Sequence, residues 1–245
     1  ASSTRLSVID RLYIGGTSTT TIRGDAATST FAGGLDVTGF VNVDQYSGFK
    51  QNMATILYAS STNFSTLVGI GAGAANPSDG NFNTAIGYQA LNIANGADSL
   101  TAVGYRALAA NTSGALNTAL GSTALEDNTT GASNVAVGGN ALANNTTGDG
   151  NVAVGRRSLD TNTSGSGNTA FGQESLFSNT TASENTAVGF SALRANTTGA
   201  SSTAIGYEAG RANTTGSLNT FLGFGSGYTD GVVTTTANLT NANAF

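Results

Sequence analysis

The sequence predicts an all-β fold, a parallel β-solenoid (β-roll) of about nine 17-residue coils that follows a β-rich stalk segment. Three observations predict it: glycines at equal spacing, a strand-like segment before each glycine and a turn-like segment after it. The repeat glycines are Gly87, Gly104, Gly121, Gly138, Gly155, Gly172, Gly189, Gly206 and Gly223. Equal coils require such a constant spacing, because one inserted residue would shift every later residue out of line with its neighbours in the stack.

The composition narrows the function classes. Only 9% of the 245 residues are charged, the formal net charge is −5, and the chain has neither His nor Cys. An ordinary soluble protein has about 25% charged residues. The acidic balance disfavours nucleic acid as a partner, and the absence of a long apolar run disfavours membrane insertion. Without His or Cys the commonest catalytic bases and metal ligands are missing, so we expect no enzyme, cofactor or metal site.

The predicted elements begin with a stalk or capping segment over residues 1–66. Leu12 to Gly16 and Thr28 to Val43 alternate in polarity and are punctuated by glycine, which is typical of short strands and turns. The solenoid region spans residues 67–235. It opens with an irregular coil at Gly69 to Gly73, after which Pro77 and an 18-residue spacing interrupt the register.

Each repeat glycine ends a short strand with the pattern Asn-Thr-Ala-Val-Gly. Alternation along a strand puts the Ala on one face and its two neighbours on the other. Both faces are small or apolar, whereas a strand buried on one side alternates with polar residues. We expect the Ala face to pack on leucines inside the coil and the other face to be covered by a partner chain. The predicted core and seam residues are Leu108, Leu142, Leu176, Val103, Val137, Val154 and Val188.

The second half of each coil contains an x-x-Ala-Leu stretch and an Asn-Thr-Thr/Ser-Gly turn. The first is either a second short strand or a single helical turn, since periodicity does not separate them over so few residues. Asn and Gly supply the backbone conformations that a tight turn needs. Seven Asn-Thr-Ser/Thr triplets from Asn111 to Asn213 also match the glycosylation sequon, and we favour the turn because its geometry requires the same residues.

Two segments carry a resemblance to known families. Asn185 to Leu193 (N-T-A-V-G-F-S-A-L) and Ser202 to Gly210 (S-T-A-I-G-Y-E-A-G) resemble the S-V-A-I-G repeats in the heads of trimeric autotransporter adhesins. The longer 17-residue form looks even more like repeats of bacteriophage tail fibres and bacterial surface proteins that end in a self-cleaving chaperone domain. The resemblance covers roughly residues 67–235. It implies a β-roll in which three identical chains surround one axis.

The resulting hypothesis is a structural segment of an extracellular, cell-surface or virion-surface homotrimeric fibre, with itself as partner and further assembly end to end. The alternative is a phage receptor-binding tail fibre that binds or cleaves surface glycans, with a host or cell-surface glycan or protein as partner. Tyr88, Tyr105 and Tyr207 follow repeat glycines and are weak candidates for glycan contact; covering a corner or seam is the favoured role. Arg157 and Glu174 occupy one column in successive coils, which predicts an ion pair between coils.

The C-terminal ten residues, 236–245, leave the 17-residue register. Asn243-Ala244-Phe245 resembles the start of another strand that stops before its glycine. A solenoid needs a unit that covers its exposed end, and these polar residues are too few to make one. We therefore expect that the natural chain continues or was cleaved near here, and that the last coil exposes an edge.

Overall fold

The computed structural model describes residues 49–51, 54–59, 64–74, 82–93 and 96–227. The chain divides into two compact units, residues 1–42 and 43–245, and the described residues all belong to the second. Most of the predicted stalk, Pro77 and the segment 236–245 lie outside them. No described helix has the length and apolar character needed to cross a membrane.

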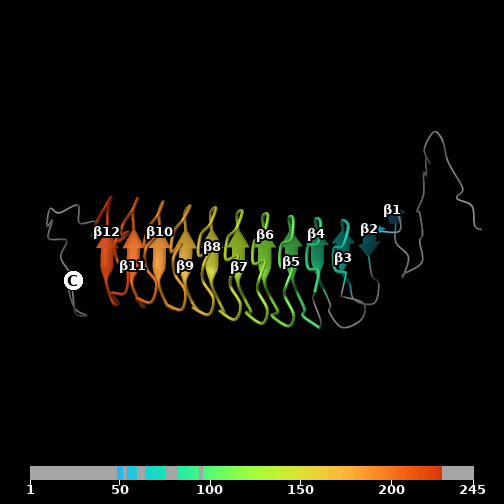
Figure 1. Cartoon of the computed structure of the whole chain (residues 1–245), viewed down its shortest axis with the longest axis horizontal. Helices are drawn as coiled ribbons and strands as arrows, with labels where there is room; N and C mark the ends of the chain where they lie inside the picture. The colour runs from blue at the N-terminus through green and yellow to red at the C-terminus, as the bar shows by residue number, and fades with distance from the viewer. Residues whose placement is uncertain (1–48, 52–53, 60–63, 75–81, 94–95, 228–245) are drawn as a thin grey trace, which may run out of the picture. The chain divides into compact units, whose positions relative to one another are not determined.

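The described residues form one sheet of twelve strands in sequence order (Figure 1). The strands are β1 Phe49–Gln51, β2 Ala54–Ala59, β3 Thr66–Val68, β4 Thr84–Ile86, β5 Thr101–Val103, β6 Thr118–Leu120, β7 Val135–Val137, β8 Val152–Val154, β9 Thr169–Phe171, β10 Thr186–Val188, β11 Thr203–Ile205 and β12 Thr220–Leu222. From β3 onward every pair of neighbours is parallel, while β2 pairs antiparallel with both β1 and β3. The predicted parallel β-solenoid is confirmed.

Successive strands pair residue for residue at the 17-residue spacing. Ala102 pairs with Ala119, and the same register continues to Ala136 and on to Ala170. The predicted alanine column is therefore confirmed. At about 4.8 Å between neighbouring strands, the stack from β4 to β12 is roughly 40 Å long.

The apolar core lies between the strands and the x-x-Ala-Leu stretches. The strand alanines are fully buried, and so is a column of leucines that lies four residues after each glycine. These leucines are Leu91, Leu108, Leu125, Leu142, Leu159, Leu176 and Leu193. The core is thus one alanine and one leucine deep, which explains why both positions repeat so strictly.

The x-x-Ala-Leu stretch is neither a strand nor a helical turn. Its backbone alternates in hand: Arg106 and Leu108 have φ near +51° and flank Ala107. Its N–H groups reach neighbouring coils, since Leu108 donates to the carbonyl of Ala124 at 3.0 Å. A left-handed conformation costs a non-glycine residue roughly 1–2 kcal/mol. Burying a leucine contributes about 1.5–3 kcal/mol, so core formation offsets that strain.

The repeat glycines occur where successive coils approach most closely. Gly155 has φ +130°, and a Cβ built on it would lie 2.6 Å from the carbonyl carbon and oxygen of Gly172 in the next coil. No side chain fits at such a distance. The glycine spacing therefore reflects backbone stacking rather than a turn alone.

Two ladders of buried asparagines form the polar part of the core. Asn145 Nδ2 donates to Asn128 Oδ1 at 2.8 Å and to the carbonyl of Gly148 at 3.0 Å. In the second ladder the Asn151 N–H donates to Asn134 Oδ1 at 2.9 Å. Each amide thus satisfies a turn within its own coil and links that coil to the next.

A candidate self-association surface on the sheet

The outer face of the sheet consists of two columns that flank the buried alanines, and we call it the sheet face. The columns are Thr84, Thr101, Thr118, Val135, Val152, Thr169, Thr186, Thr203 and Thr220, and Ile86, Val103, Leu120, Val137, Val154, Phe171, Val188, Ile205 and Leu222. None of these residues is charged. Several of the large side chains are substantially exposed in the single chain, with Leu120 at 47% and Phe171 at 56%. The sheet face is therefore a continuous uncharged surface over nine strands.

The predicted site residues separate into three environments. Leu108, Leu142 and Leu176 lie in the core with no exposed surface. The predicted seam residues Val103, Val137, Val154 and Val188 lie on the sheet face and are only half-buried in the single chain. The repeat glycines form the backbone contacts between coils.

Charged side chains gather on the flank, by which we mean the positions two to five residues after each repeat glycine. The five ion pairs found among the described residues join Arg106 to Glu126, Arg156 to Glu174, Arg157 to Asp160, Arg194 to Glu174 and Arg211 to Glu208. All but Arg156, which directly follows its glycine, are flank residues. The charged surface and the uncharged sheet face are therefore separate parts of each coil.

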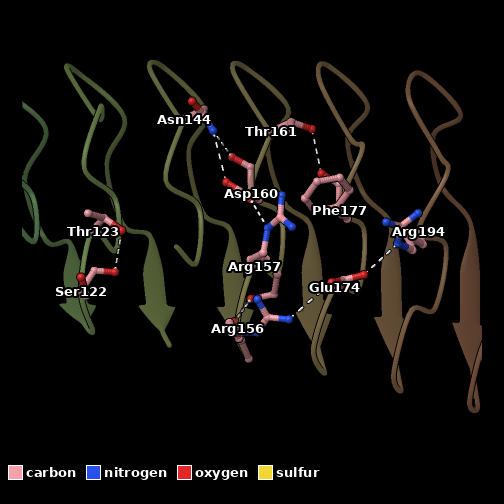
Figure 2. Close-up of polar contacts among 12 residues, drawn as sticks. Ser122, Thr123, Asn144, Arg156, Arg157, Asp160, Thr161, Glu174, Phe177 and Arg194 are labelled. Atoms are coloured by element: carbon pink, nitrogen blue, oxygen red, sulfur yellow. Dashed lines mark hydrogen bonds and ion pairs between the residues drawn. The ribbon is translucent and has the colours of Figure 1, made fainter. Parts of the chain in front are cut away.

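The predicted ion pair between Arg157 and Glu174 is corrected by the structure (Figure 2). Arg157 Nε instead lies 2.9 Å from Asp160 Oδ2 in its own coil, and its guanidinium covers the ring of Phe177, 4.4 Å from the centroid. Glu174 pairs with Arg194 at 2.9 Å and with Arg156 at 3.6 Å. The aromatic ring directs Arg157 away from the vertical partner, which the column pattern alone did not reveal.

Glu174 is the one flank carboxylate with a resolved change in acidity. The hydrogen bond from Arg194 lowers its pKa, an effect opposed by burial and reinforced by the positive charges of Arg194, Arg157 and Arg156. The carboxylate therefore remains ionised and bound to arginines at neutral pH. Among the described residues no group of three or more carboxylates could hold a metal ion.

The tyrosines considered for glycan contact belong to stacked columns of rings. Tyr88 and Tyr105 stack with centroids 5.7 Å apart, and Tyr207 lies 5.1 Å from Phe190 and 5.2 Å from Phe224, each pair nearly parallel. Sugars stack on the faces of aromatic rings. Here each ring covers a face of its neighbour and presents mainly its edge to solvent, which favours lateral packing over glycan binding.

The sequon asparagines form the first buried ladder. Six of the seven are fully buried and Asn213 is half-buried. In Asn145 the Nδ2 atom, to which a glycan would attach, donates two hydrogen bonds inside the coil. The sequence analysis interpreted these asparagines as turn residues and missed the ladder. The strict repetition of two asparagines per coil is the signal that could have indicated it.

Comparison with known proteins places no name on the chain. No family model, no curated protein and no solved structure matches it. The argument for function therefore depends on the surface itself.

Proposed function

We propose that the chain is a structural segment of an extracellular homotrimeric fibre in which the sheet faces of three identical chains pack together. The observation that carries the proposal is the uncharged sheet face, continuous from β4 to β12, on a chain whose ion pairs lie on the flank. Exposed apolar patches of this extent usually mark interaction sites. A second copy supplies an equally long and equally uncharged partner surface.

The available area is sufficient for stable association. The stack is roughly 40 Å long, and a strand with its two bordering residues is about 20 Å wide. The resulting surface of roughly 800 Å² per chain equals the contribution of one partner to a standard protein interface. The flatness of a repeated parallel sheet lets the whole length contribute.

Chemical composition supports an environment outside the cell, on a cell surface or on a virion. The described surface consists largely of threonine, serine, asparagine and glycine, and the chain has no cysteine that could be oxidised. The role is mechanical: stacked backbone ladders and buried amide ladders resist extension. In a fibre, such segments also continue end to end.

The test is the oligomeric state of the purified protein by light scattering, before and after Val137→Asp. We expect a trimer of the unaltered chain. The substitution introduces an unpaired carboxylate into the middle of the sheet face, where burial of a charge is costly. The variant should dissociate to single chains that keep their β-sheet circular dichroism.

Asn140→Asp is the matched control. Asn140 belongs to the same coil but is an exposed flank residue, and its left-handed backbone, φ +58°, suits Asp as well as Asn. The control should remain trimeric. A monomeric unaltered chain, or equal dissociation of both variants, would refute the proposal.

A further inference from the structure

The sheet face by itself does not define the alignment of two chains. Every coil presents nearly the same pair of residues, so a displacement of one copy by one coil, about 4.8 Å, again places threonine and valine columns against each other. A closed ring of identical chains requires zero displacement. A displaced contact leaves unpaired coils at each end, and such heterologous contacts lead to open assemblies.

The sheet face is also nearly unchanged when the chain is turned end for end. Its centre is the valine group Val135, Val137, Val152 and Val154 on β7 and β8. On either side of this group the Thr column continues with threonines only. An inverted copy would therefore find much the same surface as a parallel one.

The two columns that border the sheet face are irregular and differ from coil to coil. The leading border, five residues before each repeat glycine, is Phe82, Ser99, Leu116, Ser133, Gly150, Gly167, Glu184, Ser201 and Leu218. The trailing border, directly after each glycine, is Tyr88, Tyr105, Ser122, Gly139, Arg156, Gln173, Phe190, Tyr207 and Phe224. All are exposed or half-buried. Only these columns can distinguish one alignment from another.

Rotation about an axis parallel to the stack brings opposite edges of the sheet together, so the trailing border of one copy meets the leading border of the next at the same coil. In five coils a large side chain then meets a small one. These pairs are Tyr105 with Ser99, Leu116 with Ser122, Arg156 with Gly150, Gln173 with Gly167, and Tyr207 with Ser201. Ser133 and Gly139, at the centre, are both small, whereas two large residues meet at Phe82 with Tyr88, Glu184 with Phe190, and Leu218 with Phe224.

The inverted arrangement lacks this complementarity. It places each trailing border against the trailing border of the partner, so that Tyr105 would meet Phe190 and Tyr88 would meet Tyr207. Each of these rings already stacks on a neighbour in its own column, which restricts its movement. Large residues would hold the two sheets apart where the parallel arrangement lets them approach.

We propose that the border columns act as a register key that selects parallel, in-register packing of identical chains. This inference rests on the proposed self-association and specifies its geometry. The repeated sheet face supplies most of the contact area, and the irregular borders supply the specificity. Discrimination comes from contacts that fail in the wrong alignment as well as from those that form in the right one.

Cysteine pairs test the alignment, because the chain has no cysteine of its own. Ser133→Cys with Gly139→Cys reports the in-register arrangement, Leu116→Cys with Gly139→Cys a displacement of one coil, and Ser122→Cys with Gln173→Cys the inverted arrangement. At Gly139 φ is not positive and a Cβ would meet nothing closer than 3.9 Å, so cysteine is tolerated there. In every pair the two positions are too far apart within one chain for a disulfide.

We expect the first pair to form disulfide-linked dimers and trimers on oxidation, visible on a non-reducing gel, and the other two pairs to remain single chains. Linkage mainly through the second or third pair would overturn the register key while leaving self-association intact. A chain that is monomeric by light scattering and forms no intermolecular disulfide would refute the proposed function and this inference together.

Removal of the key gives the second arm. The quadruple variant Tyr105→Ser, Arg156→Ser, Gln173→Ser and Tyr207→Ser leaves the sheet face unchanged. Combined with each cysteine pair, it should reduce in-register linkage several-fold and produce displaced linkage and polydisperse assemblies. Undiminished in-register linkage in this variant would overturn the assignment of register to the borders.

Discussion

The interior coils and the end coils of the solenoid fill the same core from opposite sides. In an interior coil the strand contributes Ala and the turn contributes Leu, as with Ala136 and Leu142. At the N-terminal end the strand contributes Leu67 and the corresponding turn residue is Gly73, whose Cβ would lie 2.6 Å from Leu67 Cδ1. The volume is conserved while its origin is exchanged.

The C-terminal end repeats this exchange with a larger side chain. Phe221 replaces the strand alanine, and glycines at 210 and 227 replace the turn leucine. A Cβ on Gly210 would lie 2.6 Å from Phe221 Cδ2, and one on Gly227 would also collide with that ring. Glycine adopts the left-handed turn conformation without strain. The comparison teaches that the core demands a fixed volume in each coil and accepts it from either side.

The largest effect is expected at the backbone contacts, which only interior coils have on both sides. Gly155→Ala introduces a Cβ 2.6 Å from the backbone of Gly172 at a strained φ, and we expect a loss of about 3–5 kcal/mol in unfolding free energy. Gly223→Ala in the last coil meets nothing within 4 Å, so only its strained φ of +104° should cost, about 1–2 kcal/mol. Urea denaturation at one protein concentration measures both. Equal losses would show that stacking distance is unimportant.

The exchanged core is tested by making the end coil resemble an interior coil. Phe221→Ala should cost about 2–3 kcal/mol by leaving a cavity, and Gly210→Leu about 1–3 kcal/mol by overpacking against the ring. The double variant recreates the Ala and Leu pair, and we expect it to recover about 1–3 kcal/mol relative to additivity. Denaturation of all four proteins completes the cycle. Additive losses would contradict compensation between the two sites.

The asparagine ladder should be weaker at its end than in its interior. Asn145→Ala removes two donated bonds and leaves Asn162 Nδ2 without its acceptor at 2.8 Å, at a cost of about 2–3 kcal/mol. Asn213 also donates two bonds, to Asn196 Oδ1 and the Gly216 carbonyl, but is only half-buried. Its replacement by Ala should cost about 1 kcal/mol. The reverse order, in denaturation or in amide hydrogen exchange of the neighbouring coils, would argue against a cooperative ladder.

The smallest effect is expected on the flank of the interior coils. The pKa of Glu174 is lowered in the folded state, so its contribution to stability is present above the ordinary carboxyl value of 4.5 and disappears as the pH falls through the lowered value. Glu174→Gln should cost less than about 1 kcal/mol at pH 7, and the difference from the unaltered chain should vanish in acid. Thermal denaturation at pH 7 and pH 3 measures it. A difference that grows in acid would contradict the sign.

The uneven success of the sequence analysis has a physical origin. Contacts between coils follow from the 17-residue spacing, so the alanine column and the parallel pairing could be predicted from Ala102, Ala136 and Ala170 alone. Contacts that depend on side-chain direction could not. Arg157 and Glu174 share a column, yet the ring of Phe177 draws Arg157 toward Asp160. The buried asparagines were likewise assigned to turns because their amides serve both a turn and the next coil.

The sequence by itself determined the solenoid, its repeat length and the two apolar faces of its strands, because a stack of equal coils translates linear spacing directly into position. Only the tertiary structure decided which polar groups are inside, where the ion pairs form and how the end coils fill their core. These features arise between residues that are neighbours only once the coils are stacked. Leu108 illustrates the difference: its place in the repeat is visible in the sequence, but its left-handed backbone exists because the core on which it packs rewards that conformation.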